Sequence, residues 1–439
     1  MATTYLSKNL PANQNSLHKW TYSGWIKRCG LGAETYLFNF YDDDNNRGGL
    51  RFNADDTLFY YERVGGSTVV NKTTNRKFRD TAFWYHVMVA VDKSVSSPDT
   101  QIYINGVEET SFSTDTDYTQ NLSTKINDND NLYINSYNGS SDIKDQVQTH
   151  VHWVSGYKLT PTTFGETDST SGIWKPKASP SGITYGTNGF FLKFENSAAM
   201  GTDSSGNSNT FTVSGTLTQN VDTPSNNFAT LNNLNAMNQP TLTNGNNTLS
   251  VGSNNWKISP STLAPSSGKW YVEHKVSANS GYVGIGIIDT DDYGSNTNIQ
   301  YSGETANSVM VYSSTGEKWI NDANTSYGDS YTTNDIIGVA MDLDNNKVYF
   351  SKNGTWMNSG NPESGATGTG AIDIPTGGSG EFYILPSIYN ATVQCNFGQG
   401  YFGTTQVASA GTAPSEGGIF EYDCPSGYQA LCTKGINSF

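Results

Sequence analysis

The stretch WYHVMVAVDKSVSSPDTQIYINGVEE, residues 84–109, determines the class of fold. Val87, Val89 and Val91 alternate with other side chains, and two isoleucines repeat the alternation after a polar loop. A period of two over such short runs indicates half-buried β-strands. The pair Asn105-Gly106 that follows is a strong hairpin signal, because both turn residues must accept a positive φ. The stretch therefore predicts a strand, a loop, and a second strand that ends in a tight turn.

The composition of the whole chain agrees with this local pattern. The 439 residues are too many for one small β-sandwich, so two or three domains are expected. Aromatic residues make up 12%, which is ample material for packed cores, and 45 glycines suit many short strands joined by turns. An all-β protein is predicted.

Charge and cysteine usage exclude several classes of partner. The formal net charge is -15 and the sequence has no useful Lys/Arg cluster, so neither nucleic acid nor an anionic membrane is expected as a partner. The chain has no run of about 18 apolar residues and no secretory start, so neither membrane insertion nor secretion is expected. We therefore expect the protein to be made in a reducing cytoplasm. Its cysteines are then expected to be free thiols: Cys29, Cys395, Cys424 and Cys432.

The first region, residues 1–215, resembles a known sandwich family. The segments SGWIKR, WYHVMVAVD with IYINGVEE, and HWVSGYKLTPTTFGE resemble the concanavalin-type or laminin-G-like sandwich. More narrowly, they are similar to virion structural proteins of marine bacteriophages of the cyanophage and pelagiphage kind. Four further segments match that group in order: IWKPK (173–177), YGTNGFFLKFE (185–195), TDSSGNSNTFTV (202–213) and DTPSNNFATLN (222–232).

The end of this first region is expected to return to its beginning. In many laminin-G-like domains the Phe…Asp-Ser-Ser-Gly-Asn segment comes first, whereas here it comes last, at 190–213. Phe190, Leu192 and Phe194 alternate and need an apolar face to cover. Residues 190–215 are therefore predicted to fold back onto 1–160 as permuted strands, the alternative being that they open the following domain.

The second half of the chain resembles another β-sandwich. Residues 216–255 are rich in Asn and Thr and are predicted to form an irregular connector. Residues 256–403 resemble the SPRY domain, above all in the hairpin IIGVAMDLDNNKVYFSKNG, where Ile337, Val339 and Met341 should face inward. The tail, 404–439, is predicted to pack back on this domain, with docking on a neighbour as the alternative.

No catalytic arrangement stands out in the sequence, so the protein is predicted not to be an enzyme. Glu166 and Asp168 have the alternate spacing of a glycosidase pair but lie in a polar turn. His150 and His152 share a strand face without a third metal ligand at a familiar spacing, which favours a structural role.

Acidic and aromatic loops are the remaining candidates for function. The segment YDDDNNRGG (41–49) offers Asp42 and Asp44 as hard oxygen ligands, and laminin-G-like sandwiches often carry calcium on rim loops, so Ca²⁺ is a candidate cofactor. Because loops on a rigid sandwich present recognition surfaces, aromatic loop residues beside polar ones are candidate ligand contacts. These are Tyr41, Tyr137, Asn138, Tyr293 and Trp356.

The patterns and the resemblance together predict a bacteriophage virion protein. The preferred hypothesis is a tail-fibre or receptor-binding adhesin on the virion surface that recognises a host-surface glycan or protein. The alternatives are a capsid decoration or tail-attached knob that binds other virion proteins, and a polysaccharide depolymerase. A homo-oligomer is expected, with a trimer favoured, because phage appendages occupy symmetry axes.

Overall fold

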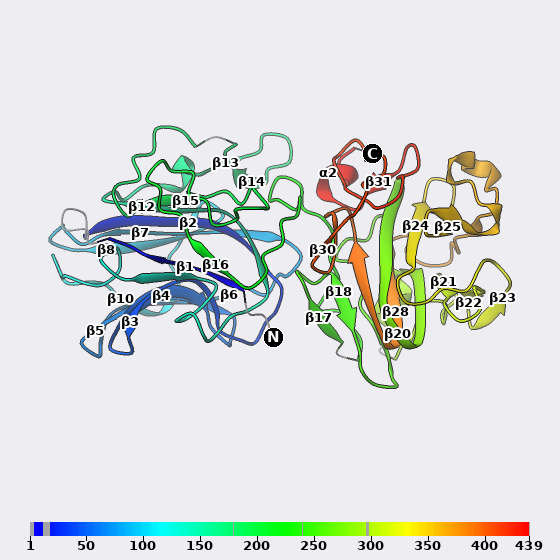
Figure 1. Cartoon of the computed structure of the whole chain (residues 1–439), viewed down its shortest axis with the longest axis horizontal. Coiled ribbons are helices and arrows are strands. Elements are labelled where there is room, and N and C mark those ends of the chain that lie inside the picture. The colour runs from blue at the N-terminus through cyan, green and yellow to red at the C-terminus, as the bar shows by residue number, and fades with distance from the viewer. Residues whose placement is uncertain (1–3, 12–17, 179, 239, 296–297, 439) are drawn as a thin grey trace. The chain divides into compact units, whose positions relative to one another are not determined.

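The computed structural model describes residues 4–11, 18–178, 180–238, 240–295 and 298–438 (Figure 1). The chain divides into two compact units, Met1–Gln219 and Asn220–Phe439. The described residues are nearly all strand and turn. Their helices are the short α1 (Thr290–Ser295) and α2 (Thr433–Ile436), with three 3-10 turns, η1 (Pro161–Thr163), η2 (Met357–Ser359) and η3 (Pro362–Thr367). The predicted all-β class of tandem sandwiches is confirmed.

Two antiparallel sheets form the first unit, and Figure 1 shows them as stacked layers. The eight-stranded sheet has the order β10 (Phe112–Thr116), β6 (Ser67–Lys77), β5 (Thr57–Val64), β4 (Asn46–Phe52), β3 (Thr35–Asp43), β11 (Asn131–Ile134), β1 (Tyr5–Asn9) and β16 (Thr212–Ser214). The six-stranded sheet has the order β15 (Phe190–Leu192), β12 (Gln146–Ser155), β2 (Lys19–Arg28), β7 (Trp84–Asp92), β8 (Asp99–Ile104) and β9 (Val107–Glu109).

The core of this unit lies between the two sheets. The three valines of β7 and the two isoleucines of β8 face it, as their alternation predicts. Trp20 of β2 and Trp153 of β12 stack at its centre with ring centroids 4.6 Å apart. The turn after β8 has positive φ at both Asn105 and Gly106, which confirms the hairpin.

The other face of β7 corrects the expectation of a half-buried strand. Met88 and Ala90 are also fully buried, in a smaller cluster with Trp25 and Phe164. The segment that carries η1 and the hairpin β13 (Gly165–Thr167) and β14 (Trp174–Pro176) supplies other members of that cluster. Alternation therefore located the strand, but it could not show that a later segment covers its second face.

Residues 190–214 form strand pairs inside the first unit. β15 pairs antiparallel with β12, and β16 pairs antiparallel with β1 at the edge of the other sheet. Phe190, Leu192 and Phe211 are buried in the core between the sheets. The last strands of the unit thus complete both of its sheets.

The second unit is built around two long strands, β20 (Lys269–Asp289) and β28 (Phe382–Asn396), which pair along most of their length. Its other main strands are β17 (Thr241–Thr243), β18 (Thr248–Ser250), β19 (Trp256–Ile258), β21 (Ser308–Tyr312), β22 (Lys318–Ile320), β23 (Ala323–Thr325), β24 (Ile336–Asp342) and β25 (Lys347–Lys352). Short pairs involve β26 (Thr355–Trp356), β27 (Ile372–Asp373), β29 (Tyr401–Phe402), β30 (Thr405–Gln406) and β31 (Gln429–Ala430). Ile337, Val339 and Met341 of β24 face the core, as the hairpin pattern predicts.

The segment expected as an irregular connector belongs to the second unit. β17 and β18 form a hairpin whose second strand pairs with β28. Ala229 and Leu231 are fully buried in the core of that unit. The Asn/Thr-rich composition of residues 216–255 suggested a linker. The few apolar side chains of this segment are nevertheless enough to anchor it in the core of the second unit.

The C-terminal tail packs against the second unit. β31 pairs in parallel with the start of β20, and Phe420 and Tyr428 are buried against Tyr271 and Tyr349. Cys29, Cys395, Cys424 and Cys432 all lie among the described residues, are buried, and form no disulfide there, while the free-thiol state in the cell stays a prediction. Among the described residues no helix is long and apolar enough to span a membrane.

Candidate functional site

The candidate site lies where the β3–β4 hairpin meets the loop between β11 and β12. We call the group Tyr41, Asp44, Arg47 and Tyr137 the rim site. Tyr41 and Arg47 are cross-strand partners beside the hairpin turn. Asp43 shapes that turn, because its Oδ1 accepts hydrogen bonds from the backbone N–H of Asn45 at 2.7 Å and of Asn46 at 2.8 Å.

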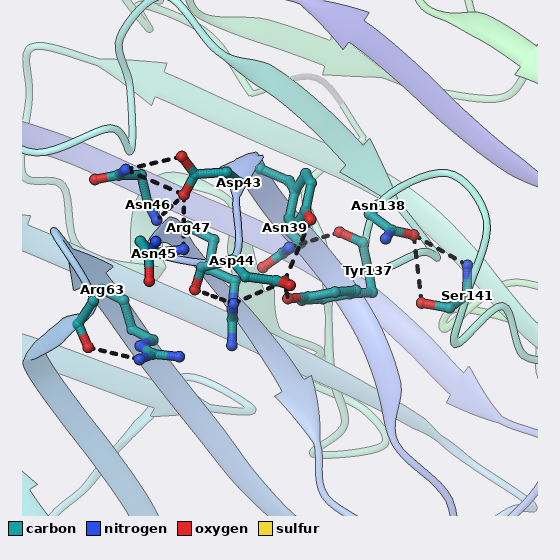
Figure 2. Close-up of polar contacts among 12 residues, drawn as sticks. Asn39, Asp43, Asp44, Asn45, Asn46, Arg47, Arg63, Tyr137, Asn138 and Ser141 are labelled. Atoms are coloured by element: carbon teal, nitrogen blue, oxygen red, sulfur yellow. Dashed lines mark hydrogen bonds and ion pairs between the residues drawn. The ribbon is translucent and has the colours of Figure 1, made fainter.

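Three donors converge on the Asp44 carboxylate, and Figure 2 shows the contacts from Tyr137 and Arg47. The Tyr137 hydroxyl donates to Oδ1 at 2.8 Å, the Tyr41 hydroxyl at 3.3 Å, and Arg47 Nη1 at 3.1 Å. The Arg47 guanidinium also lies 5.3 Å from the centre of the Tyr137 ring, a cation–π distance. The Asp44 side chain is 76% exposed and that of Arg47 only 17%, so the carboxylate faces solvent while the guanidinium is largely covered.

Electrostatics keep the Tyr137 phenol protonated. Burial and then the hydrogen bond to Asp44 raise the pKa of Tyr137 well above its usual range. The two tyrosine rings meet edge to face with centroids 5.1 Å apart. The rim site therefore brings aromatic faces, hydroxyls, a carboxylate and a guanidinium together on one small surface, and these groups can hydrogen-bond and stack on a ligand.

A buried asparagine holds the Tyr137 loop against the sheet. Asn39 of β3 donates from Nδ2 to the Tyr137 carbonyl at 2.7 Å, and its Oδ1 accepts from the Tyr61 hydroxyl at 3.3 Å. Its cross-strand partner is Gly49, where an added Cβ would lie 2.4 Å from Asn39 Oδ1. The missing side chain on β4 thus makes room for the amide that fixes the loop.

Arginine and aromatic rings continue the same outer sheet face. Arg51 of β4 lies 5.1 Å from the Phe59 ring centre and 5.8 Å from that of Tyr61, and it pairs with Glu34. Phe59 and Tyr61 themselves stack with centroids 4.8 Å apart. The sequence reasoning missed Arg47 and Arg51, although both occupy outward positions beside the buried Gly48, Leu50 and Phe52 of β4.

The structure separates the remaining candidates of this region from the rim site. Asn138 turns into its own loop, where its Oδ1 accepts from the backbone N–H of Ser140 and Ser141. Asp42 pairs with Lys125 at 3.2 Å, whereas Asp44 binds Arg47. No group of three His, Cys, Asp or Glu side chains that could hold a metal ion occurs in the described ranges. Calcium stays an untested prediction.

Two predicted contacts in the second unit turn out to be packing residues. Tyr293 of α1 is 1% exposed and donates to the Asn235 carbonyl at 2.5 Å. The sequence DTDDYGSN looks like an open loop, but the helical turn directs the ring inward. Trp356 of β26 packs edge to face on Tyr271 and Tyr349. Burial corrects Tyr293 as a ligand candidate, whereas ligand contact by the partly buried Trp356 stays a prediction.

The groups considered for catalysis have structural partners. Asp168 binds Lys175 at 2.6 Å and accepts from Thr170 and Ser171 in its own turn, so it stabilises the β13–β14 hairpin. His152 is fully buried, stacks on Phe191 with centroids 3.8 Å apart and bonds the Tyr185 hydroxyl through Nδ1. His150 bonds Thr149 through Nδ1.

Comparison with known proteins finds a family for part of each unit. Residues 3–152 match the concanavalin A-like lectin/glucanases superfamily, and residues 269–400 match the SPRY domain. No curated protein matches the chain.

Solved structures give short and distant likenesses. The SPRY domain of human HERC1 is 14% identical, with 38% of this chain and 96% of that chain covered and a TM-score of 0.30. A human SPRY domain is 16% identical, with 34% and 90% covered and a TM-score of 0.27. The heptameric SAP-like pentraxin of Limulus polyphemus is 15% identical, with 36% and 72% covered and a TM-score of 0.27. The two family matches alone indicate a laminin-G-like domain of the concanavalin type over residues 3–152, followed by a SPRY domain over residues 269–400.

Proposed function

We propose that this protein is a non-catalytic adhesin of a bacteriophage virion, of the tail-fibre or receptor-binding type, that recognises a host-surface glycan or protein. The observation that carries the proposal is the rim site. Its exposed carboxylate, guanidinium, hydroxyls and aromatic faces converge on one surface of a rigid sandwich. Such a surface can hydrogen-bond sugar hydroxyls or peptide groups and stack on their apolar faces.

The proposal extends to how the protein acts in the particle. It is made in the host cytoplasm and is displayed on the virion surface as a homo-oligomer, a trimer by preference. A shallow site binds weakly because association is costly and little area is buried. Several copies on one particle would then supply useful attachment through multivalency.

Binding of the purified full chain to an array of bacterial surface polysaccharides and lipopolysaccharide glycans tests the proposal. We expect the wild type to bind a subset of the array, and Tyr137→Ala to lose at least about fivefold in apparent affinity, as for an anchoring aromatic. Tyr157→Ala is the matched control, because Tyr157 is a 46% exposed tyrosine of the same unit outside the rim site. Equal binding of the array by the two variants would show that the rim site does not bind the ligand. Immunogold labelling of particles tests virion location separately.

A further inference from the structure

Five aromatic rings of the second unit form a closed circuit around a cavity of about 220 Å³. We call Trp256, Tyr282, Tyr301, Tyr312 and Trp319, with Met310, the aromatic cage, and these six residues line the cavity. They come from five segments: β19, β20, β21, β22 and the loop between α1 and β21. None of them belongs to the rim site or to the sites predicted from the sequence.

The ring spacings describe the circuit. The centroid distances are 6.4 Å for Trp256–Tyr282, 5.5 Å for Tyr282–Tyr312, 5.9 Å for Tyr312–Trp319, 6.0 Å for Trp319–Tyr301 and 5.3 Å for Tyr301–Trp256. A regular five-membered circuit with such sides has its centre about 5 Å from every ring, within the roughly 6 Å reach of a cation–π contact. The planes of neighbouring rings are inclined by 20° to 85°, so the five rings do not form one flat platform.

The strand pattern explains how the cage is built. In β20 and β21, Val283, Ile285, Val309 and Val311 face the core, so Tyr282, Met310 and Tyr312 take the opposite face. An added Cβ at Gly284 would lie 2.0 Å from Met310 Sδ, and Met310 is 1% exposed. The thioether therefore lies over the glycine and forms the floor of the cage, while Tyr282 remains 42% exposed at its edge.

Charge around the cage favours a cationic ligand. The Tyr301 hydroxyl donates to Asp322 Oδ1 at 2.7 Å, which increases the electron density of that ring. Glu304 lies on the same loop and accepts from the backbone N–H of Gln300 at 2.7 Å. The six lining side chains carry no positive charge, and the chain as a whole carries -15.

We propose that the aromatic cage binds a quaternary ammonium group, as in choline and other trimethylated amines. Several aromatic rings around one cavity, with the Asp322 carboxylate hydrogen-bonded to one of them, can bind such a cation through cation–π contacts. A cavity of about 220 Å³ is smaller than the roughly 300–1,000 Å³ of pockets for larger ligands, which suits a headgroup better than an oligosaccharide. The inference goes beyond the proposed adhesin function and is independent of the rim site.

Isothermal titration of the full chain with choline tests the proposal, and 3,3-dimethyl-1-butanol, the uncharged carbon isostere of choline, is the matched probe. We expect choline to bind at least about tenfold more tightly than the isostere, because the shapes agree and only the charge differs. Tyr282→Ala should lower choline affinity about tenfold, as for a contact aromatic. Tyr157→Ala, with similar exposure, should leave it unchanged. Because Tyr282 is 42% exposed, its substitution should not unfold the domain.

Each outcome decides the proposal. Failure of choline to bind at millimolar concentration, equal affinity for choline and the isostere, or preference for maltotetraose would overturn it. If choline binds, sedimentation with phosphatidylcholine vesicles identifies the source of the group. Co-sedimentation with the vesicles would identify the ligand as a lipid headgroup. Choline binding without co-sedimentation would identify it as a soluble or peptide-borne trimethylamine. Either result supports the aromatic cage as a quaternary ammonium site. If the Tyr282→Ala and Tyr157→Ala variants bind the glycan array like the wild type, the result for the aromatic cage does not depend on the rim site.

Discussion

At the scale of single residues, hydrogen-bond chemistry determines the tautomer of a buried histidine. Trp174 Nε1 lies 3.0 Å from His86 Nδ1, and an indole N–H can only donate, so Nδ1 must accept. The proton of the neutral ring is therefore on Nε2, which lies 2.8 Å from Ser23 Oγ. Burial lowers the pKa of His86 to about 3. His86 thus joins the β13–β14 hairpin to β2 in its neutral form.

This arrangement makes the first unit sensitive to acid. The pKa of His86 is about 6.5 in the unfolded chain and lower in the folded unit, so the unfolded state binds more protons below pH 6.5. Stability is then present above pH 6.5 and is lost as the pH falls. We expect His86 alone to remove about 2 kcal/mol of unfolding free energy at pH 5.

The His86→Gln variant, which keeps one donor and one acceptor but does not titrate, should lack this loss. Urea unfolding of the full chain at pH 7 and pH 5, with the transition of the first unit followed by tryptophan fluorescence, measures it. The matched variant is His274→Gln, which changes a buried histidine of the other unit and, in the full chain, should leave the transition of the first unit unaltered. An equal acid loss in wild type and His86→Gln would contradict the assignment.

At the scale of elements, strands from distant parts of the sequence complete each sandwich. β15 and β16 close the edges of the two sheets of the first unit and bury Phe190, Leu192 and Phe211. Replacing one such phenylalanine by alanine typically costs about 3–5 kcal/mol, so the loss of all three side chains exceeds the stability of an ordinary domain.

A chain ended at residue 189 should therefore not fold, whereas a chain ended at residue 219 should. Far-ultraviolet circular dichroism during heating distinguishes the two. The longer chain should melt cooperatively, and the shorter one should show no cooperative transition. Matching melting temperatures for the two chains would show that β15 and β16 are dispensable.

A buried carboxyl group of β20 is one of the anchors of the C-terminal tail. Glu273 of β20 accepts from the backbone N–H of Glu421 at 2.8 Å and of Tyr422 at 2.9 Å, and also from Asn396 and Tyr271. Four donors thus meet two oxygens in the core. An amide at this position presents its own donors to those N–H groups, which leaves buried groups unpaired.

Glu273→Gln should therefore loosen the tail and lower the unfolding free energy of the second unit by about 1–3 kcal/mol. Hydrogen exchange of residues 420–432, read by mass spectrometry, should speed up in this variant. The exposed Glu381→Gln should exchange like the wild type. Unchanged protection of the tail in Glu273→Gln would mean that apolar packing of Phe420 and Tyr428 alone retains it.

At the scale of the whole molecule, alternation and turn residues predicted the two sandwiches, because each strand carries its own pattern. Of the rim site, the sequence singled out Tyr41, Asp44 and Tyr137 in acidic or aromatic segments, whereas Arg47 acquires meaning only through its cross-strand register with Tyr41. The prediction that Tyr293 contacts a ligand was wrong because six residues of sequence do not distinguish a short helix from a loop. The aromatic cage combines five separate segments, and no local pattern encodes such proximity.

The central claim is that the rim site of the laminin-G-like domain mediates attachment to the host. The most direct measurement is the adsorption rate of purified phage particles that carry Tyr137→Ala, compared with Tyr157→Ala particles of equal protein composition. Because hot-spot losses at each copy are multiplied by multivalency, we expect the Tyr137→Ala particles to adsorb at least about tenfold more slowly while remaining intact. Normal adsorption by these particles, or their disassembly without a binding defect, would contradict the adhesin role and favour a structural protein of the virion.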